Sequence, residues 1–174
     1  MGYKHLSVTD FLFNRGNIIS IFGSSGTGKT ALGLHVIREM RNGVFISTTG
    51  QGYKGRIKGR WDSMFVDASG EYELFVAVME AVEMDPRVIV VDAINRFYRI
   101  NRKISQFLMT LNILKLARRR VLMTWEMSTN NRVSGHKIMT FYSDDIFRTT
   151  GRYIIGNGRR CKFAIREDGV LGCT

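Results

Sequence analysis

The sequence predicts an α/β protein in which a mostly parallel central sheet is flanked by helices. Short apolar runs alternate along the chain with segments whose apolar residues recur at helical spacing, and this alternation is typical of parallel sheets. A glycine-rich octet, GSSGTGKT at 23–30, joins the first apolar run to the first helical segment. The chain has 174 residues, of which 44% are hydrophobic, so we expect one core and a single domain over residues 1–174.

The individual elements follow from these patterns. Strands are expected at NIISIF (17–22), GVFIST (43–48), MFVDA (64–68), VIVVD (88–92) and RVLMTWE (120–126). Helices are expected over about 29–41, around 74–82 before the only proline, and over about 102–117. The runs DIFRTT, RYII and CKFAI follow, the last two separated by GNGRR. They predict a C-terminal antiparallel extension that closes one edge of the sheet.

The octet has the spacing G-x-x-x-x-G-K-[ST] of a phosphate-binding loop, or P-loop. Glycines let consecutive backbone N–H groups surround an anion at a helix N-terminus. Lys29 would neutralise the β- and γ-phosphates, and the hydroxyl of Thr30 would ligate Mg²⁺. The predicted nucleotide-binding residues are Gly23, Ser24, Ser25, Gly26, Thr27, Gly28, Lys29 and Thr30.

An acidic residue is also needed to hold the metal ion. Asp92 ends the apolar run RVIVVD, which places it at the carboxyl edge of a buried strand, where such a ligand is expected. We therefore predict Thr30 and Asp92 as the metal-binding residues.

Charge favours a polyanionic partner. The chain has 26 Lys and Arg against 15 Asp and Glu, which gives a formal net charge of +11, and nucleic acid is the first candidate. A generally basic surface without a nucleic-acid partner is the alternative. Cys161 and Cys173 lie twelve residues apart without a CxxC or a histidine cluster, so we expect reduced thiols in a cytoplasmic protein and no zinc site. The longest apolar runs are too short to span a membrane.

Several segments carry a resemblance to a known family. In order, they are GNIISIFGSSGTGKT, VIVVDAINRFYR, VLMTWEMS, SGHKIMTFYSDDIFR and RRCKFAIREDGV. They resemble the RecA-like ATPase core of the archaeal RadA and eukaryotic strand-exchange recombinases, and the segment SGHKIMTFYSDDIFR is most similar to the archaeal RadB paralogues. The resemblance implies ATP and Mg²⁺ as cofactors, weak DNA-related ATPase activity and a role in homologous recombination or DNA repair. It implies single-stranded DNA and a recombinase or paralogue as partners, and leaves a homo-oligomer open.

The chain departs from this family at two catalytic positions. Thr49, in FISTTGQG, stands where the family has a catalytic glutamate, and a hydroxyl cannot serve as that base. The strand VLMTWEMS has Trp125 and Glu126 where the family has Asn-Gln. Glu126 is either a replacement that polarises the attacking water or a structural carboxylate that meets an arginine. With Lys29 and Glu126 as the catalytic candidates, slow hydrolysis is expected.

Two basic segments are candidates for DNA contact. The segment GYKGRIKGRW alternates basic residues with small or apolar ones between Tyr53 and Trp61, which suits a single strand. The polar segment STNNRVSGHK corresponds to a DNA-contacting loop of the family. The predicted DNA-binding residues are Lys54, Arg56, Lys58, Arg60, Arg132, His136 and Lys137. The alternative is a solvated basic loop, or one that meets an acidic patch on a partner protein.

Further expectations concern the ends of the core and the alternative functions. We expect no separate N-terminal DNA-binding domain within residues 1–174, and hence no autonomous filament. Arg159 and Arg160, in GNGRR, are candidates to reach a neighbouring subunit's phosphates. The alternative functions are a non-hydrolysing, ATP-binding mediator that docks on a recombinase, which Thr49 favours, and a small-molecule P-loop kinase.

Overall fold

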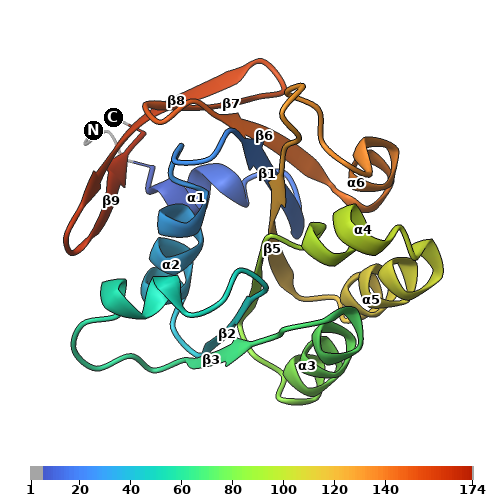
Figure 1. The fold of residues 1–174 in the computed structure, drawn as a ribbon. Helices are drawn as coiled ribbons and strands as arrows, with labels where there is room; N and C mark the ends of the chain where they lie inside the picture. Colours follow the sequence, from blue (N-terminus) through green and yellow to red (C-terminus); the bar gives the residue numbers. More distant parts are fainter. Residues whose placement is uncertain (1–5, 174) are drawn as a thin grey trace.

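The computed structural model describes residues 6–173, and Figure 1 shows their arrangement. Within these residues one nine-stranded sheet runs through the molecule in the order β3-β2-β4-β5-β1-β6-β7-β8-β9. The parallel strands are β1 Ile18–Gly23, β2 Gly43–Ser47, β3 Met64–Asp67, β4 Val88–Asp92, β5 Arg120–Glu126 and β6 Asp145–Thr149. The antiparallel strands are β7 Tyr153–Gly156, β8 Arg159–Arg166 and β9 Gly169–Gly172. The predicted α/β sheet with an antiparallel extension is confirmed.

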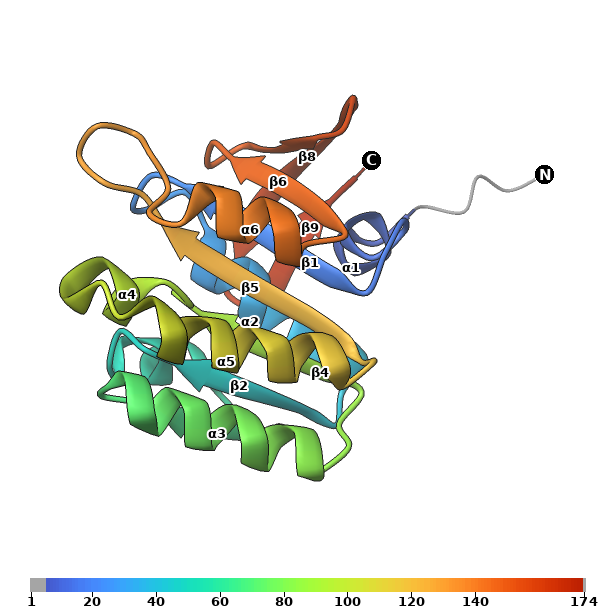
Figure 2. The ribbon, with the colours of Figure 1, turned by 90° about the vertical axis from the view of Figure 1, so that its right-hand side faces the viewer.

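Helices cover both faces of the sheet. Their bounds are α1 Val8–Leu12, α2 Lys29–Met40, α3 Glu71–Glu83, α4 Arg96–Asn101, α5 Ile104–Leu116 and α6 His136–Tyr142, with a short 3₁₀ helix, η1, at Gly52–Arg56. One face packs on α1 and α2, and the other packs on α3, α4, α5 and α6. Figure 2 shows α3, α5 and α6 side by side along one face, with β2, β5 and β6 pointing the same way. The carboxyl ends of these strands therefore meet at one edge.

Strand β4 shows why the sheet carries continuous apolar runs. All five of its residues are buried. Val88 and Val90 pack on the α1–α2 side, whereas Ile89 and Val91 pack on the α3–α5 side. Successive side chains of a strand point to opposite faces, so the part of a strand that is covered on both faces is apolar at consecutive positions, here Val88 to Val91.

The chain between 96 and 142 differs from the sequence prediction in two places. The helix expected over 102–117 is α5, and it is preceded by a separate short helix, α4. The break falls at Arg102, whose φ of 57° is left-handed and ends α4. The polar segment predicted as a loop is helical from His136 onward, and Gly135, whose φ of 85° favours glycine, precedes the first turn of α6.

The expectation of reduced cysteines is wrong, because Cys161 and Cys173 form a disulfide with a Cα–Cα distance of 4.6 Å. The cause is the β8–β9 hairpin, which the sequence patterns did not reveal because two of the four residues of β9, GVLG, are glycines. The hairpin pairs Phe163 with Gly172, and the amide of Cys173 donates to the carbonyl of Lys162 at 2.9 Å. Antiparallel pairing thus brings together two cysteines that are twelve residues apart.

Glu71 begins α3 with a buried carboxylate and provides a test of the packing. The residue is 6% exposed, and neither carboxyl oxygen has a hydrogen-bond partner among residues 6–173. Burial raises the pKa of Glu71, so the folded chain holds the proton more tightly than the unfolded chain. We expect Glu71→Gln to raise the free energy of unfolding at pH 7 by about 1 kcal/mol. The gain should fade as the pH falls from the raised pKa of Glu71 toward the ordinary carboxyl pKa, and it should vanish below the ordinary pKa, where both states are protonated.

Glu73, two residues further on, is the matched control for urea titrations across pH. Its carboxylate accepts hydrogen bonds from the amide and hydroxyl of Ser69 at 2.9 and 2.6 Å, and these bonds lower the pKa of Glu73. Glu73→Gln should therefore destabilise the chain at neutral pH, and the loss should shrink on acidification. A destabilised Glu71→Gln variant at pH 7 would contradict our account of the buried carboxylate.

Candidate nucleotide-binding site

The glycine-rich loop lies between β1 and α2, as the octet predicts. Gly28 has a φ of 95°, which favours glycine. A Cβ atom at Gly23 would lie 2.4 Å from the hydroxyl of Thr149, so this position also requires glycine. No side chain caps α2, and the backbone N–H groups of its first turn therefore remain to be satisfied by another acceptor. The N-terminal end of α2 is suited to an anion.

Lys29 lies across the mouth of this loop. Its ammonium group donates to the carbonyls of Gly23 and Ser24 at 2.7 and 2.9 Å. Burial lowers the pKa of Lys29, and the nearby carboxylates of Asp92 and Glu126 partly offset this effect. A phosphate in the loop would offer the ammonium a charged acceptor in place of two neutral carbonyls. The position thus fits the predicted role of Lys29.

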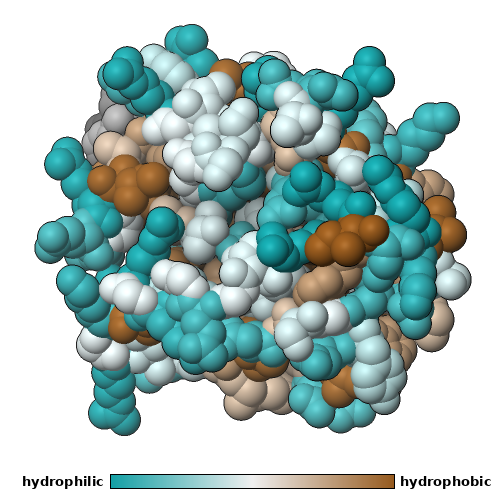
Figure 3. All heavy atoms as spheres, viewed as in Figure 1, coloured by the Kyte–Doolittle hydropathy of each residue, from teal (hydrophilic) through white to brown (hydrophobic). Residues whose placement is uncertain are grey.

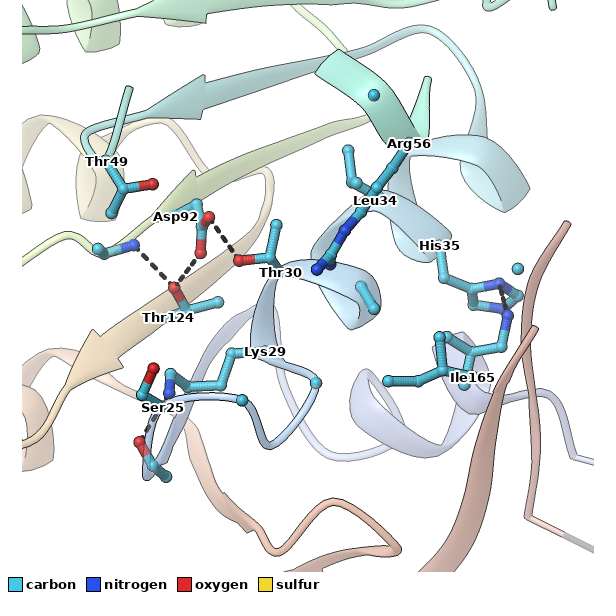
Figure 4. A pocket seen from close by; sticks show the side chains of 18 of the residues that line it. Ser25, Lys29, Thr30, Leu34, His35, Thr49, Arg56, Asp92, Thr124 and Ile165 are labelled. Carbon is cyan, nitrogen blue, oxygen red and sulfur yellow. Dashed lines mark hydrogen bonds between the residues drawn. The ribbon is translucent and has the colours of Figure 1, made fainter. Parts of the chain in front are cut away.

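Asp92 and Thr30 meet beside the loop, as predicted for a metal site. The Thr30 hydroxyl donates to Oδ2 of Asp92 at 2.8 Å, and the Thr124 hydroxyl donates to Oδ1 at 2.6 Å (Figure 4). Asp92 is 4% exposed. Within residues 6–173 no group of three or more His, Cys, Asp or Glu residues could hold a metal ion by itself. Mg²⁺ commonly uses one or two protein oxygens together with phosphates and waters, and Thr30 with Asp92 fits that pattern.

Glu126 is placed beside these groups by the strand order. Strand β5 lies between β4 and β1, so its last residue falls between Asp92 and the loop. The Asn95 side chain accepts from the Glu126 amide at 2.8 Å and donates to the Glu126 carbonyl at 3.0 Å. The carboxylate forms ion pairs with Arg96 at 3.2 Å and Arg99 at 2.5 Å. Of the two roles left open for Glu126, this structure displays the contact with arginines.

Thr49 also lies at the pocket, just beyond the end of β2. Its hydroxyl is 3.4 Å from that of Ser47. Within residues 6–173 the carboxylates that line the pocket are Asp92, Glu126 and Glu167. Thr49 supplies no carboxylate to the pocket, whereas the last residue of β5 supplies Glu126.

The loop, Asp92 and Glu126 open into one cavity of about 870 Å³. Three elements enclose it: α2 forms the floor, the segment that includes η1 forms one wall, and the tip of the β8–β9 hairpin forms another. Its basic residues are Lys29, Arg38, Arg56, Lys58, Arg99 and Arg166. These outnumber the three carboxylates, and the cavity has the size of a small-molecule site with a positive balance of charge.

The predicted DNA-binding residues do not form one surface. Arg56 and Lys58 line the cavity, Lys54 pairs with Asp67 at 3.4 Å, and Arg60 is exposed outside the cavity. The second group lies at the start of α6 and just before it; its members are Arg132, His136 and Lys137. Figure 1 shows η1 and α6 on opposite sides of the molecule. If both groups of residues contact DNA, they do so on two separate surfaces of the molecule.

The expectation that Arg159 reaches a neighbouring subunit is not supported. Its guanidinium pairs with Asp145, donates to the Phe11 carbonyl at 3.3 Å, and is 16% exposed. It is directed inward, toward the buried carboxylate of Asp145 in β6. Arg160 points elsewhere and lies over the ring of Tyr153 at 4.9 Å.

Comparison with known proteins supports the fold. A scan of protein-family models gave no match, and no curated protein matches the chain. Among solved structures, a KaiC-like protein from the hyperthermophilic archaeon Pyrococcus horikoshii OT3 superposes with a TM-score of 0.74. The alignment covers 98% of this chain and 97% of that chain at 17% identity. At this identity the likeness establishes the fold, and the chain has a RecA-like α/β fold with a P-loop.

Proposed function

We propose that this chain binds Mg²⁺·ATP in the cavity at the P-loop and hydrolyses it slowly. The observation that carries the proposal is the convergence of Lys29, Thr30 and Asp92 at one end of the sheet, with 2.8 Å between the Thr30 hydroxyl and the Asp92 carboxylate. Backbone amides and Lys29 would hold the phosphates, and Thr30 with Asp92 would hold the ion. The magnesium ion would neutralise charge on the transferred phosphoryl group.

Glu126 is proposed to orient the attacking water in place of the absent glutamate. Arg96 and Arg99 both pair with its carboxylate, so they compete with a water molecule for its oxygens, and slow turnover is expected. Glu126→Gln is expected to lower kcat for ATP hydrolysis about 100-fold, with little change in the Kd for Mg²⁺·ATP. Steady-state phosphate release measures the first quantity, and calorimetry measures the second.

Thr49→Ala is the matched control, since Thr49 lines the same pocket without a carboxylate. It should hydrolyse ATP within a few-fold of the wild type. If Glu126→Gln turns over ATP as fast as the wild type, Glu126 is a structural carboxylate. A wild type that binds ATP with no turnover would instead indicate the non-hydrolysing mediator.

We further propose that the chain acts in DNA recombination or repair as a paralogue of the RadA and RadB type, with weak single-stranded DNA binding. The support is the set of family-like segments, the net charge of +11 and the exposed basic residues Arg60, Arg132, His136 and Lys137. Docking on a recombinase is the corresponding protein partnership. Adding single-stranded DNA to the same hydrolysis assay should raise kcat, and an unchanged rate would count against a DNA-linked ATPase. No helix within residues 6–173 is long and apolar enough to cross a membrane.

A further inference from the structure

The basic segment GYKGRIKGRW, residues 52–61, was expected to meet DNA and instead forms a wall of the nucleotide cavity. Gly55, Arg56, Lys58 and Trp61 all line the cavity, opposite the β8–β9 hairpin. Figure 4 shows the Arg56 side chain extending from η1 into the pocket, above α2 and toward Thr30 and Leu34. The guanidinium group therefore points into the cavity, toward the side on which the P-loop lies.

Both ends of this wall are anchored by aromatic residues. Tyr53 is 4% exposed, donates its hydroxyl to Asp67 at 2.6 Å, and stacks on Phe65 with ring centroids 5.9 Å apart. Trp61 meets the same Phe65 ring edge-on at 5.5 Å, and Arg38 of α2 lies over the Trp61 ring at 5.3 Å. Tyr53 and Trp61, the two rings that flank the basic residues, therefore pack on Phe65 and hold this wall against the core.

The Arg56 side chain has no ion-pair partner within residues 6–173. This distinguishes it from Lys54 of the same segment, which pairs with Asp67. An anchored segment that directs an unpaired guanidinium into a cavity is arranged for an anionic ligand, because a planar guanidinium can donate two parallel hydrogen bonds to a phosphate.

We propose that Arg56 binds the phosphate chain of the nucleotide from the side opposite the P-loop, within the same chain that supplies Lys29. This inference rests on the proposed binding of Mg²⁺·ATP and adds to it the residue that completes the site. A basic group from a neighbouring subunit is then not required, and one chain binds the nucleotide by itself. Lys58 lines the same wall and adds positive charge to it.

The test compares calorimetric titrations of four chains with magnesium and the non-hydrolysable analogue AMP-PNP. Arg56→Ala should weaken binding about 10- to 100-fold, and Arg56→Lys, which keeps the charge, should recover part of the affinity. Arg60→Ala is the matched control, since Arg60 lies in the same segment outside the cavity. It should bind the analogue within about two-fold of the wild type. Circular dichroism melts check that all four chains fold.

A mixing experiment tests whether Arg56 acts within its own chain. Lys29→Ala and Arg56→Ala chains are titrated separately and as an equimolar mixture, and the mixture should show no tight sites. Tight sites in the mixture would mean that Arg56 acts across subunits, which overturns the proposal. The proposal is also overturned if Arg56→Ala binds the analogue as the wild type does. That outcome leaves the proposed function intact, whereas a wild type without binding removes both.

Discussion

Replacing Lys29 with alanine is expected to weaken binding of Mg²⁺·ATP by at least about 100-fold, the largest functional effect of any single change we propose. Charge-assisted hydrogen bonds contribute about 1.5–3 kcal/mol each, and in the proposed complex Lys29 donates to the β- and γ-phosphates. Its ammonium group already makes two hydrogen bonds to the loop, at 2.7 and 2.9 Å, and needs little movement to reach an anion there. Competition with a fluorescent ATP analogue measures the loss.

The control for Lys29→Ala is Lys103→Ala. Lys103 is exposed at the start of α5 and does not line the cavity. Its removal subtracts the same charge from the chain and should leave nucleotide affinity within about two-fold. Equal losses in the two variants would mean that overall charge, and not the geometry of the loop, determines binding. Near-wild-type affinity in Lys29→Ala would refute the assigned role of Lys29.

Arg159→Ala is expected to cause the largest loss of stability, about 3–5 kcal/mol in the free energy of unfolding. The Asp145 side chain is 0% exposed and pairs with this arginine. Asn157 donates a second hydrogen bond to the same carboxylate. Removing the guanidinium leaves a buried carboxylate without its counter-charge. Urea denaturation followed by tryptophan fluorescence measures the change.

Arg160→Ala is the adjacent control. Arg160 is exposed on β8 and contacts only the face of the Tyr153 ring among the interactions formed by described residues. We expect a loss of about 1 kcal/mol or less. Comparable losses in the two variants would contradict the distinction between a buried ion pair and a surface contact. If Arg159→Ala folds with wild-type stability, the inward position of Arg159 is wrong.

The elements that the sequence predicted best are those whose burial leaves a clear pattern of apolar residues. VIVVD is apolar at consecutive positions because β4 is covered on both faces, and it appears as β4 over Val88–Asp92. β9 was not predicted because two of its four residues, GVLG, are glycines, which are depleted in strands. α1 was not predicted because its five residues are too few to show a helical period. The disulfide between Cys161 and Cys173 depends on that missing strand. It could not be predicted from cysteine spacing alone.

The residues of the candidate site also fall into two groups: those that the sequence predicts and those that only the structure reveals. Lys29, Thr30 and Asp92 were predictable because the P-loop has fixed spacing and a strand-terminal carboxylate has a fixed place in a parallel sheet. The partners of Glu126 were not predictable from spacing, since Arg96 and Arg99 contact it only because α4 packs beside the end of β5. The sequence analysis predicted that Arg56 binds DNA because basic residues alternate with small or apolar residues around it. Only the folded chain reveals that the two rings beside it, the buried Tyr53 and the partly buried Trp61, pack on Phe65.

The central claim is that the loop at 23–30, with Thr30 and Asp92 beside it, binds Mg²⁺·ATP, and calorimetry on the wild-type chain tests it most directly. We expect saturable heat with about one nucleotide bound per chain and a marked loss of affinity when EDTA removes the magnesium. A wild-type chain that is folded by circular dichroism and yet gives no heat of binding with Mg²⁺·ATP would contradict the account.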